Sequence, residues 1–359
     1  MSSTRIAFDT HSRYVTKAGS ARYVDGLLEG FRSIRPAGME FVEFAWPVEN
    51  LGYAQPARAL RTLYRETVWS RTVAPRALRQ MGADLLHRTT PLLPIATPRG
   101  LPEVVTLHDV APLRDPARFR RWHRVTAAAR MKRLHRATRV ICSSRFTADE
   151  AHILLGLPVE RLDVVPLGNP FASGFGPREE LRPAIEIPDR FFLFVGSLEP
   201  GKNLGLLAEA YARAASSPLP PLVVVGARRL GVAREDPPPA RWHYAGHQPD
   251  AALAWLYRHA IALLFPSRYE GFGLPVLEAM SFGCPVVCSR VTSLPEVAGD
   301  AACYADMTPA AYLDAMTTLA SDELARRQFG VLGRQQAARF SWDTCATDTA
   351  AIYRSVLRC

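Results

Sequence analysis

Apolar residues along the chain gather into short, uninterrupted runs separated by stretches with helical spacing. The runs lie at residues 5–10, 40–47, 84–90, 103–109, 139–144, 163–168, 190–197, 221–227, 241–246, 261–267 and 285–290. They do not alternate with polar positions, which is typical of strands buried on both faces of a parallel sheet. Segments such as 21–31 and 203–215 have the spacing of helices. This alternation predicts an α/β fold with doubly wound sheets.

The alternation is interrupted at residues 169–189, where Pro, Gly and charged residues are frequent and no period is present. Such a composition is typical of an interdomain linker. We therefore predict a first domain at 1–170, a linker at 171–188 and a second domain at 189–339. A last helical segment covers about 340–359. In doubly wound folds, ligands bind beyond the carboxyl ends of the strands, so the residues after each strand are the candidates for function.

The composition narrows the class of partner. The chain has 359 residues and a net charge of +10, which favours nucleic acid, an anionic membrane surface or phosphorylated ligands. No run of 18 apolar residues occurs, and the first ten residues lack the apolar core of a signal peptide. Six scattered cysteines without a C-x-x-C pair favour reduced thiols. We expect a cytoplasmic protein.

The strand at 190–197 is followed by a candidate phosphate site. Gly196 permits a close approach of backbone, and Lys202 and Asn203 stand where a helix begins. A helix amino terminus presents unsatisfied N–H groups and a positive dipole end, which together bind phosphate. The alternative is a solvated lysine followed by an asparagine that caps the helix.

The strand at 261–267 is followed by the sequence "SRYEGFGLPVLEA", in which two glutamates bracket a glycine-rich turn. Pro275 suits the first turn of a helix, so Glu270 lies in a loop and Glu278 about one turn inside the helix. Both carboxylates can accept hydrogen bonds from hydroxyl groups, as a sugar or ribose presents. The alternatives are dipole stabilisation by Glu278 and a solvated Glu270.

In the first half, His87 and His108 lie at strand ends, and Gly19 stands at a helix start. A single histidine there is as often a loop residue as a functional one; two that face one cleft favour function. Several motifs are missing: Asp-x-Asp, G-x-x-x-x-G-K-[ST], G-x-G-x-x-G after the first strand, and G-x-S-x-G. A divalent-metal pair, a nucleoside triphosphatase and a simple dinucleotide site therefore lose support.

Taken together, "FVGSLEPGKNLGLLAEAYARA" and "FPSRYEGFGLPVLEAMSFGCPVVCSRVTSLPEVAGDAA" resemble the retaining glycosyltransferases of family 4. The segments 136–169, 244–260 and 340–357 fit the same family, and the resemblance is weaker before Val104. It implies the GT-B fold, with two Rossmann-like domains facing a central cleft. The first domain would bind the acceptor, the second the sugar nucleotide, and the last helix would pack back on the first domain.

The resemblance also implies roles for single residues. Glu278 would hold the ribose hydroxyls of a sugar nucleotide, and Glu270 would contact the donor sugar. Lys202 would bind the pyrophosphate, as would backbone N–H groups around Phe272, Gly273 and Leu274. In the first domain, His108 would lie by the donor sugar and Gly19 near the phosphate.

Three positions depart from the family pattern. Ser197 and Leu198 stand where many members have Arg, Gly201 stands where related members have Arg, and Gly19 stands where some have two adjacent glycines. The phosphate site thus lacks one cation, for which Arg268 is a candidate substitute.

The resemblance predicts a retaining, metal-independent transferase that moves a hexosyl group from a sugar nucleotide to a glycan or lipid-linked acceptor. Mannose from GDP-mannose is the preferred donor, and no cofactor is expected. Three alternatives remain: a transferase that uses a UDP-sugar, an epimerase, and a catalytically silent protein of this fold that binds a glycan or nucleotide.

Residues 118–139 carry only basic charges. Phe119, Trp122, Val125, Ala129 and Leu134 are predicted to share one broad helical face. Such a helix can lie on an anionic membrane surface at the inner face of the membrane. The alternative is a domain helix that buries its apolar face on the sheet and exposes its charges. No motif for nucleic-acid binding accompanies the charge, so we expect no nucleic-acid partner.

Overall fold

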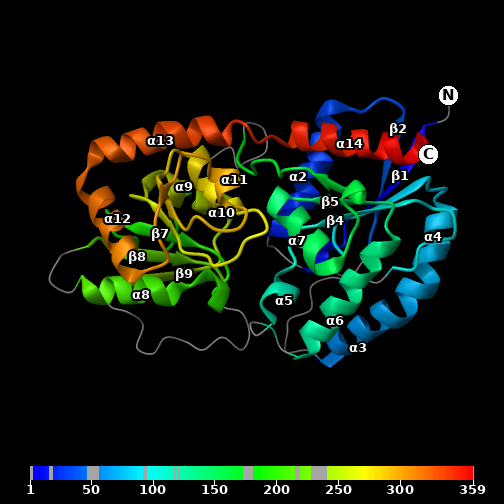
Figure 1. Ribbon diagram of the computed structural model, residues 1–359, viewed down its shortest axis with the longest axis horizontal. Helices are drawn as coiled ribbons and strands as arrows, with labels where there is room; N and C mark the ends of the chain where they lie inside the picture. Colours follow the sequence, from blue (N-terminus) through cyan, green and yellow to red (C-terminus); the bar gives the residue numbers. More distant parts are fainter. Residues whose placement is uncertain are drawn as a thin grey trace. The chain divides into compact units, whose positions relative to one another are not determined.

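The computed structural model describes residues 3–15, 19–46, 56–91, 95–116, 119, 121–172, 181–214, 219–227 and 241–358. The chain divides into two compact units, residues 1–168 with 342–359, and residues 169–341. The predicted linker falls inside the second unit by this division, and its residues 173–180 lie outside the described residues. Figure 1 shows the elements of both units along the chain.

The first unit is built on a parallel sheet with strand order β2-β1-β3-β4-β5-β6. Its strands are β1 (Thr4–Asp9), β2 (Met39–Phe44), β3 (Leu85–Arg88), β4 (Glu103–Leu107), β5 (Arg139–Cys142) and β6 (Leu162–Val164). Its helices are α1 (Ser12–Val15), α2 (Gly19–Ile34), α3 (Pro56–Tyr64), the π-helix η1 (Arg65–Val73), α4 (Ala74–Gln80), α5 (Ala111–Arg114), α6 (Arg121–Met131), the 3-10 helices η3 (Lys132–Arg136) and η4 (Val159–Arg161), α7 (Arg145–Leu155) and α14 (Trp342–Arg358).

The second unit has a parallel sheet with strand order β12-β11-β10-β7-β8-β9. Its strands are β7 (Phe192–Val195), β8 (Leu222–Val225), β9 (Trp242–Gly246), β10 (Leu263–Phe265), β11 (Val286–Cys288) and β12 (Cys303–Tyr304). Its helices are the 3-10 turn η5 (Pro200–Lys202), α8 (Leu204–Arg213), α9 (Asp250–His259), α10 (Leu274–Ser281), α11 (Leu294–Ala298), α12 (Pro309–Ser321) and α13 (Glu323–Ala337). All predicted strands are confirmed, and β12 is an additional strand.

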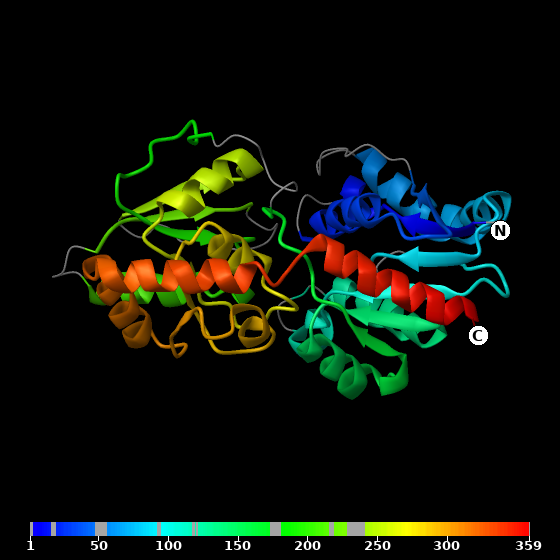
Figure 2. The ribbon, with the colours of Figure 1, turned by 90° about the horizontal axis from the view of Figure 1, so that it is seen from above.

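Helices cover both faces of the first sheet (Figure 2). Ala7 and Leu86 pack against η1 and α4, and Val105 and Leu107, on the same face, pack against α6, η3 and α7. The opposite face carries α2 and α14, which pack against each other. This two-sided burial is the reason that the strands read as continuous apolar runs.

Three glycines determine how α14 joins the first unit. A Cβ atom at Gly26 would lie 2.0 Å from Trp342 Cε2, one at Gly30 would lie 2.4 Å from the Trp342 carbonyl oxygen, and one at Gly168 would lie 2.5 Å from the Trp342 ring. Trp342 is 1% exposed. Gly26 and Gly30 have a low helix propensity, but in α2 they leave the space that Trp342 occupies.

In the second unit, one face of the sheet packs against α8 and α12 through Phe192, Phe194 and Leu264. Helix α10 packs on β10 and β11, and α9 lies beside α10. Among the described residues, no helix has both the length and the apolar character needed to cross a bilayer.

Candidate sugar-nucleotide site

The second sheet has a topological switch point between β7 and β10, because the chain runs outward from this pair in opposite directions. Ligands of doubly wound sheets bind at this point, beyond the carboxyl ends of the strands. The segments that follow β7 and β10 carry Lys202 and Glu270. The backbone N–H of Arg268 donates to the Gly201 carbonyl at 2.9 Å, which joins the two segments. The fold therefore brings together residues 68 positions apart.

Lys202 and Glu270 form an ion pair at the switch point. Lys202 Nζ lies 2.5 Å from Glu270 Oε1, and the side chains are 14% and 11% exposed. Nζ also lies 5.4 Å from the centre of the Phe265 ring. The alternatives of a solvated lysine and a solvated glutamate are therefore wrong. A cation and a carboxylate are thus held side by side at the switch point, an arrangement that can bind an anionic group and a hydroxyl group.

The backbone before α8 also differs from the simple alternative. Asn203 has φ 57° and accepts no capping hydrogen bond on its side chain, so the interpretation as a side-chain N-cap is wrong. A Cβ atom at Gly196 would make only ordinary contacts, the nearest at 3.4 Å. At Gly226, by contrast, φ is 143° and a Cβ atom would lie 1.8 Å from the Gly196 carbonyl oxygen. Gly226, after β8, is the glycine that the packing requires.

The glycine-rich turn leads directly into α10. Gly273 precedes the helix with φ 107°, Pro275 lies in its first turn, and a Cβ atom at Gly273 would lie 2.8 Å from Leu294 Cδ2. Phe272 and Leu274 beside it are buried. Glu278 follows one turn later and is only 3% exposed. Its Oε2 accepts a hydrogen bond from the Tyr257 hydroxyl at 2.8 Å.

Sequence reasoning missed the residues that hold these acids. Thr292 Oγ1 accepts from the Glu270 N–H at 3.2 Å, and the Ser293 hydroxyl donates to the carbonyls of Glu270 and Phe272 at 3.0 and 2.9 Å. Tyr257 was missed as well. Each of these residues reaches its glutamate from a separate segment of the chain, so no local motif reveals it. Its only signal in the sequence is a position near a strand end or inside an apolar helix.

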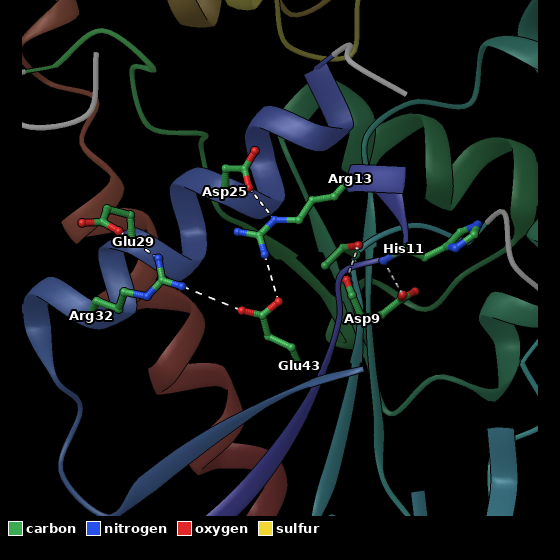
Figure 3. Close-up of polar contacts among 8 residues, drawn as sticks. Asp9, His11, Arg13, Asp25, Glu29, Arg32 and Glu43 are labelled. Atoms are coloured by element: carbon green, nitrogen blue, oxygen red, sulfur yellow. Dashed lines mark hydrogen bonds and ion pairs between the residues drawn. The ribbon is translucent and has the colours of Figure 1, made fainter. Parts of the chain in front are cut away.

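In the first unit, the switch point lies between β1 and β3. The His11 N–H donates to Asp9 Oδ1 at 2.9 Å (Figure 3). Burial raises the pKa of Asp9 to about 6. Burial, together with the Arg65 guanidinium, lowers the pKa of His11 to about 3. Nearby, Arg13 contacts Asp25 and Glu43 and so ties α1 to α2 and β2 (Figure 3).

His108 follows β4, and Gly19 is the exposed first residue of α2. His108 Nε2 lies 3.1 Å from the Thr89 carbonyl oxygen, and its ring meets Tyr23 edge-on. Because a carbonyl only accepts, Nε2 carries the ring proton and Nδ1 is an acceptor. Burial lowers the pKa of His108 to about 4, so the ring is neutral at pH 7. It can accept a hydroxyl proton but cannot serve as a cation.

His87 is a core residue. It is fully buried, and its ring nitrogens lie 2.5 Å from the Tyr353 hydroxyl and 2.8 Å from Thr106 Oγ1. The expectation that it faces a cleft together with His108 is wrong, because both ring nitrogens bond to residues inside the unit.

In the described part of the basic stretch, the apolar side chains do not share one face. Ala127 is buried, and Met131 and Leu134 are buried against the first sheet, whereas Val125 is 69% exposed. The predicted sharing of one face by Val125 and Leu134 is therefore wrong, and the side chain of Trp122 lies outside the described residues. In the described part of the chain, no group of three or more His, Cys, Asp or Glu side chains can bind a metal ion.

Two family profiles match the chain. "Glycosyltransferase Family 4" matches residues 19–169, and "Glycosyl transferases group 1" matches residues 177–336. O-antigen chain mannosyltransferase B of Escherichia coli is 33% identical over 303 residues, 77% of this chain and 76% of that protein. D-inositol 3-phosphate glycosyltransferase of Segniliparus rotundus is 30% identical over 221 residues, 55% of this chain and 48% of that protein.

Solved structures with the same fold cover almost the whole chain. Sucrose-phosphate synthase of Thermosynechococcus elongatus has a TM-score of 0.74 at 19% identity, with 99% of each chain covered. HepE of Anabaena in complex with UDP-glucose has a TM-score of 0.66 at 17% identity, with 98% of this chain and 99% of that chain covered. WaaG, a glycosyltransferase involved in lipopolysaccharide biosynthesis, has a TM-score of 0.65 at 17% identity, with 97% and 99% covered.

The fold and the switch-point site define a glycosyltransferase with the GT-B fold. The chain belongs to glycosyltransferase family 4, and it is a hexosyltransferase.

Proposed function

We propose that this enzyme is a retaining hexosyltransferase, with GDP-mannose as the preferred donor. Its acceptor would be a glycan or a lipid-linked glycan in cell-surface polysaccharide synthesis. The observation that carries the proposal is the Lys202–Glu270 pair at the switch point, beside the amino terminus of α10. The choice of mannose is supported by the similarity to O-antigen chain mannosyltransferase B.

In the proposed reaction, the bond between the sugar C1 and the donor phosphate oxygen breaks, and the acceptor oxygen bonds to C1 from the same face. The acceptor proton passes to the leaving phosphate oxygen, so no separate base is needed. Lys202 and the N–H groups at the start of α10 stabilise the charge on the departing diphosphate without a metal ion. Glu270 and Glu278 bind hydroxyl groups of the sugar and the ribose.

Two further residues have chemistry that fits this scheme. Arg268 is exposed in the segment after β10, where it would supply the cation that the family pattern has elsewhere. His108 offers a neutral nitrogen acceptor for a hydroxyl of the donor sugar.

A panel of GDP- and UDP-sugars, measured by thermal shift and by slow donor hydrolysis with and without EDTA, tests this proposal. We expect GDP-mannose to give the largest shift and hydrolysis that survives EDTA. A preference for a UDP-sugar would replace the donor assignment, an alternative favoured by the solved complex of HepE with UDP-glucose. Binding without turnover, with and without candidate acceptors, would indicate the silent alternative.

We also propose peripheral binding to an anionic membrane surface, through α3 and η1 in addition to α6. Leu60, Leu63 and Tyr64, spaced as neighbours on one helical face, are 70%, 59% and 44% exposed. Val68 on η1 is also exposed, and an ion pair between Glu66 and Arg130 joins η1 to α6. Exposed apolar side chains among basic residues favour a lipid interface over nucleic acid.

Co-sedimentation with vesicles tests this surface. Leu63→Glu should reduce binding to vesicles that contain phosphatidylglycerol, whereas Ile153→Glu, at a 69% exposed position on α7, should not. Equal binding by both variants, or no preference for anionic over neutral vesicles, would contradict the proposal.

A further inference from the structure

The buried Tyr257 lies between the glutamate that is proposed to hold the ribose and the segment by which the chain enters the second unit. Tyr257 on α9 is fully buried, and its hydroxyl donates to Glu278 Oε2 at 2.8 Å. The terminal torsion of a glutamate is broad, so packing of the stem alone does not fix the carboxylate plane. A buried hydroxyl that donates to one oxygen does fix it.

The ring of Tyr257 is itself held by two phenylalanines. It stacks on Phe282, with ring centres 6.0 Å apart and planes 10° apart, and it meets Phe171 edge-on at 6.2 Å. Phe171 also contacts Phe282, at 5.1 Å. Its backbone N–H donates to Asn169 Oδ1 at 2.9 Å, and Asn169 is the first residue of the second unit.

The chain crosses between the units twice: it enters the second unit at Asn169 and leaves it after Ser341. The second of these crossings makes a similar contact. Near the end of the second unit, Phe340 meets Phe272 edge-on, with ring centres 5.9 Å apart. The Asn169 N–H donates to the Phe340 carbonyl at 3.3 Å, so the two crossings are joined. One crossing thus contacts the support of Glu278, and the other contacts the turn proposed to bind the diphosphate.

We propose that Tyr257 is a positioning residue that aims the Glu278 carboxylate at the donor ribose, and that Phe171 couples this aim to the crossing between the units. The inference rests on the proposed role of Glu278 in donor binding. We therefore expect the affinity that a ribose hydroxyl contributes to depend on the Tyr257 hydroxyl, although this hydroxyl bonds to Glu278 and not to the ligand.

Calorimetry with GDP and UDP, and with their 2′-deoxy and 3′-deoxy forms, tests the positioning role on the full chain. In the wild-type protein, loss of the hydroxyl that Glu278 binds should weaken binding by about tenfold, as expected for a hydrogen bond to a charged group. In Tyr257→Phe, that penalty should fall to within about threefold. Tyr211→Phe removes another buried phenol of the same unit, which donates to the Pro220 carbonyl at 2.8 Å, and should keep the full penalty.

The outcomes separate the two levels of the proposal. If the wild-type protein binds no nucleotide, the donor site and this inference both fall. If nucleotides bind and Tyr257→Phe keeps the full deoxyribose penalty, only the positioning role falls. Phe171→Ala should also lower the deoxyribose penalty. Its melting temperature checks that the variant is folded. A full penalty in Phe171→Ala would remove the coupling to the crossing and leave the role of Tyr257 intact.

Discussion

Each unit contains an ion pair with the same separation, yet the two pairs have different surroundings. Arg88 Nη1 lies 2.5 Å from Glu103 Oε1 in the first unit, and Lys202 Nζ lies 2.5 Å from Glu270 Oε1 in the second. Arg88 and Glu103 are 4% and 9% exposed, and they also bond to the Pro91 carbonyl and the Thr97 hydroxyl. Lys202 and Glu270 are instead at the switch point of their sheet.

The distance between two charges therefore does not by itself reveal the role of the pair. A buried pair such as Arg88 and Glu103 is part of the core, because removal of one partner leaves a charge out of water. A pair at the carboxyl edge of a sheet can exchange its partner for a ligand phosphate or hydroxyl. The first unit thus uses its charge pair for structure, whereas for the pair of the second unit we propose a role in chemistry.

The same contrast extends to the interiors. Among the described residues, the buried Asp, Glu, His and Arg side chains of the first unit include Asp9, His11, His87, Arg88 and Glu103, whereas Glu278 is the only buried side chain of these types in the second unit. Four sets of variants or conditions test these contacts, in order of decreasing expected effect.

Glu103→Gln should lower the free energy of unfolding by about 3–5 kcal/mol, because Arg88 stays buried without its carboxylate. Urea denaturation measures the change, and the activity of the folded fraction should be preserved. The control is Glu40→Gln, which removes an ion pair to Arg5 whose side chains are 40% and 46% exposed, and should cost less than about 1 kcal/mol. Equal losses in both variants would remove the distinction between core and surface charge.

Lys202→Ala should lower turnover by about 10²–10³-fold, which corresponds to about 3–4 kcal/mol of lost stabilisation of the departing diphosphate. Steady-state kinetics on the identified donor measures this. We expect a smaller stability loss than for Glu103→Gln, since Glu270 lies at the edge of the sheet. Turnover at the wild-type rate would show that the second ion pair is also structural.

Gly226→Ala should destabilise the second unit by about 1–3 kcal/mol or more, because its backbone conformation is disfavoured for other residues and its Cβ atom would meet the Gly196 carbonyl oxygen. Gly196→Ala, whose Cβ atom has no contact shorter than 3.4 Å, should keep nearly full stability. Thermal melting distinguishes them. A larger loss at Gly196 would contradict the packing described for the segments after β7 and β8.

Acid should destabilise the first unit before the second. Burial lowers the pKa of His11 and His87 to about 3 and that of His108 to about 4. Below a pH of about 6.5, these histidines bind protons in the unfolded chain but stay neutral in the folded one. The free energy of unfolding therefore falls by up to about 1.4 kcal/mol per pH unit for each histidine. Asp9, with its pKa raised to about 6, opposes part of this loss between about pH 6 and 4, because the folded form binds its proton first.

Hydrogen exchange at pH 7 and pH 5, corrected for intrinsic rates, follows each unit separately. Peptides of β1, β3 and β4 should lose more protection than those of β7, β8 and β10. His87→Gln removes one of the three histidines with a lowered pKa. It should therefore reduce the difference in lost protection between the two units. Equal loss in both units would contradict the assignment of the buried histidines to this effect.

Much of the fold could be predicted because the relevant signals are local. Strands buried on both faces read as continuous apolar runs, and Pro275 and Gly283 at the two ends of α10 follow from helix geometry alone. The two-residue strand β12 is too short to leave such a pattern. The positions of Lys202 and Glu270 after their strands were also readable, since the switch-point rule concerns strand ends.

The apolar runs are enough to predict the two parallel sheets and the residues that follow their central strands. Which of these residues have partners, and therefore what each can do, depends on how the chain folds. His87 is a core residue because it bonds to Tyr353, Glu278 accepts a hydrogen bond from Tyr257, and the glycines of α2 leave space for Trp342. Each outcome depends on contacts between residues far apart in the chain, and periodicity records only which face of an element is buried, not which side chain meets it.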